Sequence, residues 1–509
     1  MKRLYDWACD AAEALSSAAL ALVAVLNLLL CTVLATDESA MVIVRNGLPY
    51  LVSLALWAAL LWLLAGNRRA FSRLRPETAF AVCAAAYVLM TAYLLGNVYQ
   101  WRLVGDAEAI YYTAKDLRQG VYDRLKAGGY IARYPHQLGL ASVVSAVMGV
   151  SEAPVFLRWV NLALVLLTNF ALLRACMTLP GATRATGSLS VLLSFLLVPQ
   201  LLHIVFIYGN IPGLCLMLLA AMALFAWLRG GRGAYAALAV ALVSLAYLVR
   251  NNILIACVAL AILCVLAFMR GGRRRALVIA VCLIAVPLLL PRALWAHTTR
   301  VSGEEPTHGI PSLAWVTMGM QEDGSMPGWY NNYTDRLYYQ SGYDPQTVRE
   351  IAMHDLREQL YDFRQDPVMA LRFFGRKLVS TWCEPTFGCI AIAGFQQEDC
   401  RTPLLRSLYG GGMAFAVLRE AMHGLLTLVY ALSALYPWLR RKAGAPRSAY
   451  ALFAQVFFLG GFLFHILWET KSLYVLCYCL CLAPVAAQSA TMLVGRARAR
   501  REGKAVSAA

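Results

Sequence analysis

The sequence predicts an all-α polytopic membrane protein with about 12 transmembrane helices, juxtamembrane interfacial helices and an extracytoplasmic cap. Three observations lead to this fold class. Of the 509 residues, 60% are hydrophobic and only 14% are charged. Apolar runs of about 20 residues, the length that spans a bilayer as a helix, recur along the chain. Basic residues gather in short clusters between these runs, which is typical of cytoplasmic loops.

The expected transmembrane helices are the long apolar runs, and the spacing of the basic clusters orients them. The run "HQLGLASVVSAVMGV" at 136–150 is too short for an easy crossing. If it lies on the outer surface as an interfacial helix, all later basic clusters and both termini are cytoplasmic. The expected spans are 15–36, 47–65, 79–98, 155–178, 187–207, 211–229, 233–249, 253–269, 276–295, 411–439, 448–467 and 472–494.

The polar segments divide the chain further. Segment 296–410 carries half of the 28 acidic residues, several turn signals and the amphipathic run "PQTVREIAMHDLREQLYDF", so we expect a small folded cap. It also holds Cys383, Cys389 and Cys400, two of which could form a disulfide outside the cell. The other expected divisions are two N-terminal helices (1–78), a core with the outer loop 99–154 (79–295), C-terminal spans (411–494) and a basic cytoplasmic tail (495–509).

The net charge of +17 does not predict nucleic-acid binding, because the basic residues lie in loops between apolar runs. The 14 cysteines show no metal-binding spacing, and most lie inside apolar runs, where they behave as small hydrophobic residues. The composition therefore favours the lipid bilayer as a partner and predicts neither nucleic acid nor a metal site.

Candidate catalytic residues lie in "VGDAEAIYYTAKDLRQGVY", residues 104–122. Asp106 and Glu108 begin a helix whose apolar positions recur at helical spacing, so the helix should lie on the bilayer surface. Asp106 could simply cap this helix. Alternatively, a partly desolvated Asp106 acts as a general base, and Glu108 orients an acceptor or a cation.

Two further groups of polar residues lie on the same predicted outer face. Arg133, Tyr134 and His136 in "ARYPHQLG" could line a shared cleft, although an interfacial histidine often serves only as an anchor. Arg250 occupies a tight outer turn with no acidic residue nearby in sequence, and Arg292 lies near the outer end of a later span. A charge this close to hydrocarbon indicates a functional site or a side chain that reaches towards lipid headgroups.

The late segment "WETKSLY" places Glu469, Lys471 and Tyr474 between two spans. Glu469 and Lys471 could neutralise one another. In the other interpretation, Lys471 and Arg250 together bind a phosphate at the membrane surface.

Together these motifs resemble the GT-C superfamily of polytopic glycosyltransferases, in particular bacterial family 39-like members and protein O-mannosyltransferases. The resemblance covers roughly 79–480 and rests on "GDAEAIYYTA", "RYPHQLG", the turns "YGN" and "RNN", and "WETKSLY". It implies transfer of a sugar from a polyprenyl-phosphate donor to a glycan, lipid or protein acceptor on the extracytoplasmic face, usually with inversion. The family's outer-loop acid corresponds to Asp106, with Glu108 as a second, and its phosphate-binding basic residue corresponds to Arg250.

The sequence departs from the family pattern in two places. The acid follows the third span here rather than the first, which implies two added N-terminal helices. The "YGN" turn has Asn210 where some relatives carry an acid, so no cofactor is expected to be required, although a divalent cation stays an open alternative. Two rival classes are an envelope polysaccharide polymerase or ligase and a flippase or transporter of lipid-linked sugars. A transporter should carry charges in mid-membrane, whereas nearly all charges here lie at span ends.

Overall fold

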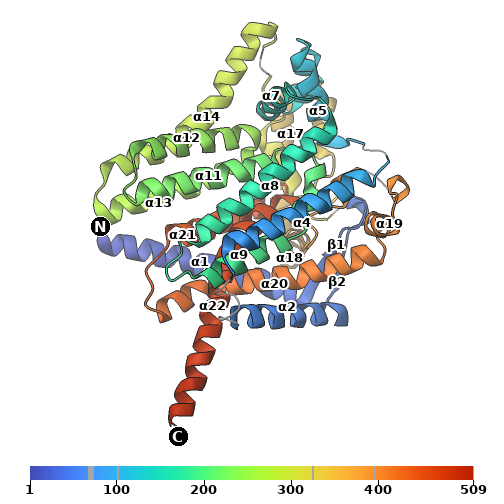
Figure 1. The fold of residues 1–509 in the computed structure, drawn as a ribbon. Coiled ribbons are helices and arrows are strands. Elements are labelled where there is room, and N and C mark those ends of the chain that lie inside the picture. The colour runs from blue at the N-terminus through green and yellow to red at the C-terminus, as the bar shows by residue number, and fades with distance from the viewer. Residues whose placement is uncertain (67–73, 100–101, 306, 324–325, 395–396, 508–509) are drawn as a thin grey trace.

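The computed structural model describes residues 1–66, 74–99, 102–305, 307–323, 326–394 and 397–507, without the side chains of 500–507. Long helices run side by side through most of the molecule (Figure 1). In the described part, ten helices are long and apolar enough to cross a membrane. They are α1 (Lys2–Leu29), α2 (Leu48–Gly66), α4 (Pro76–Gly96), α8 (Pro154–Cys176), α11 (Asn210–Leu228), α13 (Leu254–Gly271), α14 (Arg274–Ser302), α20 (Met413–Lys442), α21 (Ala449–Leu467) and α22 (Leu476–Ser507). The prediction of an all-α, multi-pass membrane protein is confirmed.

Two further predicted spans have a different form. The apolar run after residue 183 is broken into α9 (Arg184–Leu196) and a helical stretch from Pro199 to Val205, bent by 51°. Pro199 lacks the amide hydrogen that would continue the first helix, which accounts for the break. Counting this pair as one span raises the total to eleven, and α12 (Gly233–Val249) is a shorter apolar helix. The short stretch contains α10 (Pro199–Leu202).

The first predicted span, 15–36, is wrong at its C-terminal end. Helix α1 stops at Leu29, and the chain then forms an antiparallel hairpin of β1 (Leu30–Val33) and β2 (Val42–Arg45). Both strands are rich in β-branched residues, which favour extended backbone. Thr32 N donates to Cys383 O at 2.9 Å, and this bond fixes the hairpin against the segment that follows α18 (Pro367–Trp382).

Polar residues gather at the two opposite ends of the helix bundle, which form two polar faces. At one end the basic loops meet: Arg273 Nη1 donates to Leu228 O at 3.2 Å, and Arg447 pairs with Asp6 and Asp10 of α1. At the other end lie α5 (Gly105–Arg118), α6 (Tyr130–Arg133) and α7 (Leu138–Val147), and α5 and α7 pack against each other. Thus α7 stays on one face of the bundle and does not cross it (Figure 1).

Residues 303–412, called the cap segment below, fold into further helices on the second face. Because α14 continues to Ser302, this segment begins later than the predicted residue 296. A small core of tyrosine and aliphatic side chains joins its first three helices. Cys383, Cys389 and Cys400 are buried free thiols, so the structure does not contain the disulfide that the sequence left open. The helices are α15 (Ser312–Gly319), α16 (Tyr333–Gln340), α17 (Pro345–Gln365), α18 (Pro367–Trp382) and α19 (Pro403–Tyr409).

Candidate functional site

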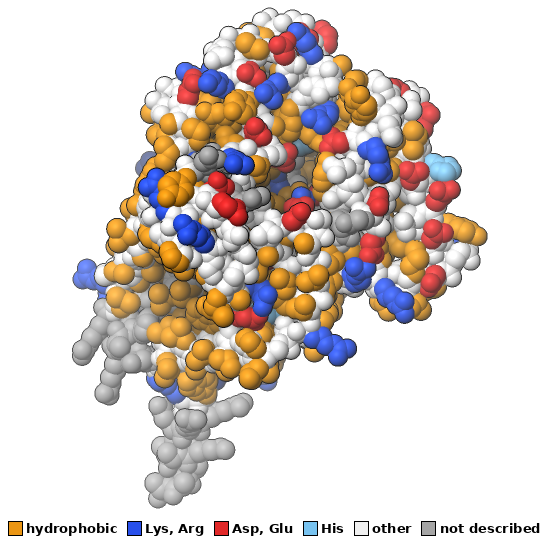
Figure 2. Space-filling view, turned by 90° about the vertical axis from the view of Figure 1, so that its right-hand side faces the viewer, with side chains coloured by type: hydrophobic (Ala, Val, Ile, Leu, Met, Phe, Trp, Pro, Cys, Tyr) orange, Lys and Arg blue, Asp and Glu red, His pale blue; other side chains and the backbone are white. Residues whose placement is uncertain are grey.

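A cavity of about 1190 Å³ lies among the loops at the second face. Figure 2 shows the hollow from this side, with acidic and basic side chains around its mouth. Its wall combines the outer loop, the turn after α12, the cap segment and the turn between α21 and α22. Eight of the residues selected from the sequence line it: Asp106, Arg133, Tyr134, His136, Arg250, Glu469, Lys471 and Tyr474.

Three other selected residues lie outside this cavity. Glu108 is exposed on α5, and Arg292 is exposed on α14; neither is part of the cavity wall. Asn210 begins α11 and lines a separate, smaller cavity of about 50 Å³ beside Arg250. Both polar atoms of the Asn210 side chain are buried without a hydrogen-bond partner in the described structure.

Asp106 does not cap its helix. Gly105 adopts a positive φ of 55° and is already the first residue of α5, so the N-cap is Val104 and Asp106 lies inside the first turn. Its carboxylate is exposed to the cavity and accepts a hydrogen bond from Tyr130 Oη at 3.1 Å. Burial, together with the nearby Tyr208 and Asp106, keeps the pKa of Tyr130 above its usual value, so Tyr130 remains a donor to this carboxylate.

Arg250 occupies the turn where α12 ends and the backbone becomes extended. Its guanidinium carbon lies 5.1 Å from the ring centre of Tyr208 and 4.9 Å from that of Tyr474. Cation–π contacts on two sides orient a guanidinium without neutralising it. Among the described residues no carboxylate forms an ion pair with Arg250, so its charge remains available to a ligand in the cavity.

Close helix packing brings Arg250 to this position. Gly209 lies against the carbonyl of Val249, where a Cβ atom would collide with the oxygen. A Cβ at Gly213 would lie only 2.9 Å from the Cβ of Arg250. These two glycines therefore let the start of α11 approach the end of α12 closely enough to seat the arginine turn.

Lys471 and Glu469 are adjacent to Arg250 in the cavity wall but do not pair with each other. Lys471 Nζ contacts both carboxylate oxygens of Glu38, at 2.8 and 2.7 Å. Glu469 is 5% exposed and accepts a hydrogen bond from Tyr474 Oη at 3.3 Å. Burial is the main cause that raises the pKa of Glu469 to about 7. The suggested mutual neutralisation of Glu469 and Lys471 is therefore wrong, because Lys471 pairs with Glu38 instead.

A residue of the cap segment organises the outer-loop part of the cavity. Asp335 of α16 accepts hydrogen bonds from Arg133 Nη1 at 3.1 Å, from Tyr134 Oη at 2.6 Å and from Tyr330 Oη at 2.5 Å. These bonds tie the outer loop to the cap segment. His136 lines the cavity nearby. Desolvation by the surrounding protein is the main cause that lowers its pKa to about 4, and the positive charge of Arg250 is a smaller cause.

Sequence reasoning missed Glu38, Asp335 and a buried lysine of the cap segment. Lys377 of α18 is 1% exposed and donates to the carbonyl oxygens of Gly319, Ile466 and Trp468, the last two at 2.9 Å. Burial lowers its pKa to about 7. Lys377 thereby fixes the end of α21 to the cap segment. No local pattern distinguishes these three residues from surface charges, because each finds its partners far away in sequence.

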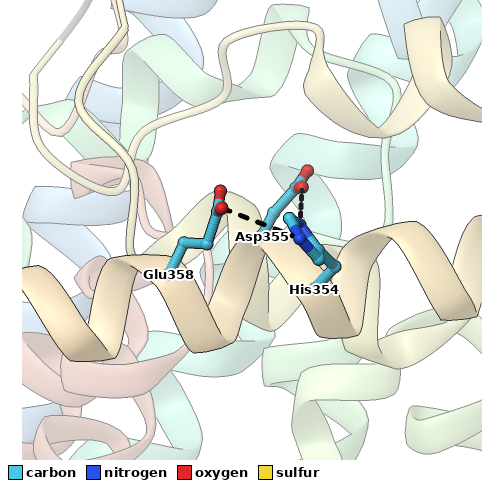
Figure 3. Close-up of side chains that lie close together, drawn as sticks. All are labelled: His354, Asp355 and Glu358. Atoms are coloured by element: carbon cyan, nitrogen blue, oxygen red, sulfur yellow. Dashed lines mark ion pairs between the residues drawn. The ribbon is translucent and has the colours of Figure 1, made fainter.

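In the described part of the chain, one group of side chains lies close enough to hold a metal ion, and it is outside the cavity. His354, Asp355 and Glu358 share one face of α17 (Figure 3). His354 Nδ1 lies 3.5 Å from Asp355 Oδ1, and its Nε2 lies 3.7 Å from Glu358 Oε1. Asp355 also accepts a hydrogen bond from Tyr333 Oη at 2.7 Å, and His354 and Glu358 are exposed. This arrangement is that of a surface charge cluster.

Comparisons with known proteins assign no family to this chain: no protein-family model and no curated protein sequence matches it.

Proposed function

We propose that this protein is a membrane glycosyltransferase that moves a sugar from a polyprenyl-phosphate-linked donor to an acceptor hydroxyl on the extracytoplasmic face. The observation that carries the proposal is the cavity itself. It joins an arginine that has no ion-pair partner among the described residues, an accessible carboxylate and an apolar part lined by two long apolar helices, α13 and α21. The arginine suits the phosphate of a lipid-linked substrate, the apolar part suits its lipid chain, and the carboxylate can remove a proton from the acceptor.

The apolar part of the cavity runs between α13 and α21. From α13 it is lined by Leu254, Ile255, Val258, Ala259 and Ile262, and from α21 by Val456, Leu459, Gly460 and Leu463. The α13 residues cover roughly 12 Å of helix length. Val258, Ile262 and Leu463 are exposed, although they are apolar. A polyprenyl chain can therefore lie along this groove while its headgroup reaches Arg250.

The proposed chemistry divides between Asp106 and Arg250. Asp106 takes the proton of the acceptor hydroxyl while the hydroxyl oxygen forms a bond to the anomeric carbon. The bond between that carbon and the phosphate oxygen breaks, and the phosphate leaves with the electron pair. Arg250 stabilises the charge that develops on the leaving phosphate. Attack opposite to the leaving group inverts the anomeric centre. No metal ion is needed for this step.

The distribution of charge supports an extracytoplasmic site. The basic loops lie together at the other end of the bundle, and lysine- and arginine-rich loops favour the cytoplasm. Under this rule the cavity and the cap segment face outward, with both termini inside. Charged residues that line the cavity lie at one end of the bundle, which favours an enzyme over a transporter with ionisable groups in mid-membrane.

The test is sugar transfer by Asp106→Asn in membranes that supply the natural acceptor. We expect the release of labelled sugar from a polyprenyl-phosphate donor to fall about 10²–10⁴-fold, the usual contribution of a general base. Glu108→Gln is the matched control, because this neighbouring carboxylate lies on the same helix but outside the cavity. Near-normal turnover by Asp106→Asn would reject the assigned role of Asp106.

A further inference from the structure

Two cations that line the cavity, Arg250 and Lys471, have different electrostatic surroundings. Arg250 lies between two tyrosine rings, and no described carboxylate pairs with it. Lys471 Nζ, in contrast, contacts both oxygens of Glu38 at 2.8 and 2.7 Å. The ammonium has a bidentate carboxylate partner and is only partly accessible, so its charge is already balanced before any substrate enters.

The fold holds Glu38 in this position. Glu38 begins a short 3₁₀ turn between β1 and β2, and the preceding Asp37 accepts a hydrogen bond from Ser39 N at 3.0 Å. The hairpin is anchored in turn, because Thr32 Oγ1 donates to Val379 O of α18 at 3.0 Å. Glu38 is therefore presented to the cavity wall by an ordered hairpin between the first two transmembrane helices.

A second carboxyl group lies between the two cations. Glu469 is 5% exposed, and the charges of Lys471, Glu38 and Arg250 all influence its ionisation. Asp106 and Glu469 act on Arg250 through their charges, but among the described residues only Lys471 of these two cations forms an ion pair with a carboxylate. A phosphate beside Arg250 therefore gains a guanidinium that is not paired, whereas a second phosphate that reaches Lys471 must compete with the carboxylate of Glu38. Like charges placed side by side weaken binding strongly.

We infer that the site accepts a lipid headgroup with a single phosphate, and that Glu38 excludes headgroups with two phosphates by occupying Lys471. This inference rests on the proposed function and narrows its donor to the polyprenyl monophosphate sugars. The linkage in such a donor carries about one negative charge, which Arg250 balances alone. A diphosphate linkage adds a further negative charge, and Arg133 and Lys471, which also line the described cavity, are already paired with Asp335 and Glu38.

The test uses two sugar-free lipids with the same polyprenyl chain: the methyl ester of polyprenyl phosphate and the methyl ester of polyprenyl diphosphate. Binding of each to the purified full-length chain in lipid nanodiscs is measured. The wild-type protein should prefer the one-phosphate lipid. Glu38→Gln should strengthen binding of the two-phosphate lipid about tenfold and leave the one-phosphate lipid nearly unchanged, which also shows that the variant is folded.

Two further variants complete the design. Lys471→Gln added to Glu38→Gln should remove the gain, because the freed ammonium is then absent. Glu322→Gln, which alters an exposed ion pair with Arg376 outside the cavity, should leave both affinities unchanged. The inference is overturned if the wild-type protein binds the two lipids equally well, or if Glu38→Gln leaves the preference unchanged. In either case, binding of the one-phosphate lipid that depends on Arg250 still supports the proposed function. Binding that is absent for both lipids, or is unaffected by Arg250→Gln, overturns the proposed function itself.

Discussion

The two polar ends of the helix bundle use charged residues differently. At the basic end, Arg440 Nη2 lies 2.9 Å from Glu13 Oε2, and both side chains are almost fully buried. Arg441 and Arg447 likewise pair with Asp10 of α1. At the cavity end, the guanidinium of Arg250 lies against the rings of Tyr208 and Tyr474 and forms no ion pair among the described residues. The carboxylate of Asp106 is open to the cavity and accepts a hydrogen bond from Tyr130.

This difference separates structural charges from functional ones. A buried pair gives a charge its partner inside the fold, so removing one member destabilises the protein. A charge held in a cavity without an ion-pair partner stabilises the fold little and is available to a ligand. We therefore expect substitutions at the basic end to change stability, and substitutions at the cavity end to change activity.

The largest expected effect is at Arg250. Arg250→Gln should lower sugar transfer about 10²–10³-fold, because the guanidinium no longer stabilises the leaving phosphate. Its thermal stability in detergent should change little, since no described ion pair is lost. Arg441→Gln, at an exposed pair of the basic end, is the control and should transfer sugar at a near-normal rate. Equal losses of activity in both variants would remove the distinction between the two ends.

The reverse effect is expected at Glu13. Glu13→Gln leaves the buried Arg440 without a carboxylate and should lower the free energy of unfolding by about 3 kcal/mol. Titration with denaturing detergent measures this change. The exposed pairs of Asp10 provide the comparison, and Asp10→Asn should cost less than about 1 kcal/mol. Transfer per folded molecule should remain normal in both variants, and a selective loss of activity in Glu13→Gln would contradict the account.

Lys377 gives a pH-dependent prediction. Its pKa is about 7 in the folded protein and about 10.4 when unfolded, so between these values the unfolded chain binds more protons. Lys377 should therefore make the fold more stable as the pH rises from about 7 to 10, by at most about 1.4 kcal/mol per pH unit. Lys377→Met should abolish this slope. Parallel unfolding titrations of both proteins across this range measure it, and identical slopes would show that Lys377 is not a source of the pH dependence.

The smallest effect is expected at Gly105. Gly105→Ala forces a side chain into a backbone conformation with φ of 55°, which should cost about 1 kcal/mol of unfolding free energy. There is open space around this glycine, so the cost comes from the backbone alone. Activity should fall modestly because Asp106 follows directly. Gly96→Ala, at the end of α4 in similarly open space and without a positive φ, is the matched control and should show neither change.

The helical framework was predictable because long apolar runs have few other stable conformations in a bilayer. The position of α7 on one face was also predictable, since any crossing by 136–150 would have reversed every later basic loop. The end of α1 was not predicted: residues 30–36 are apolar enough to continue a helix, but their pairing with 42–45 forms a hairpin.

The details of the cavity were less predictable than the helices. The sequence left open whether Asp106 caps its helix or acts as a base. Gly105 starts α5 one residue earlier, so Asp106 lies in the first turn and its carboxylate accepts a hydrogen bond from Tyr130 instead of capping the helix. Lys471 and Glu38 lie 433 residues apart in the chain, so their pairing depends on packing that no local pattern encodes. The same holds for Asp335, which accepts hydrogen bonds from Arg133 and Tyr134 about 200 residues away.

The most direct test is a structure of the protein determined with the methyl ester of polyprenyl phosphate bound. We expect density for the phosphate against the Arg250 guanidinium, with the lipid chain between α13 and α21. Density for the phosphate among Arg440, Arg441 and Arg447 at the basic end, with the Arg250 cavity empty, would contradict this expectation.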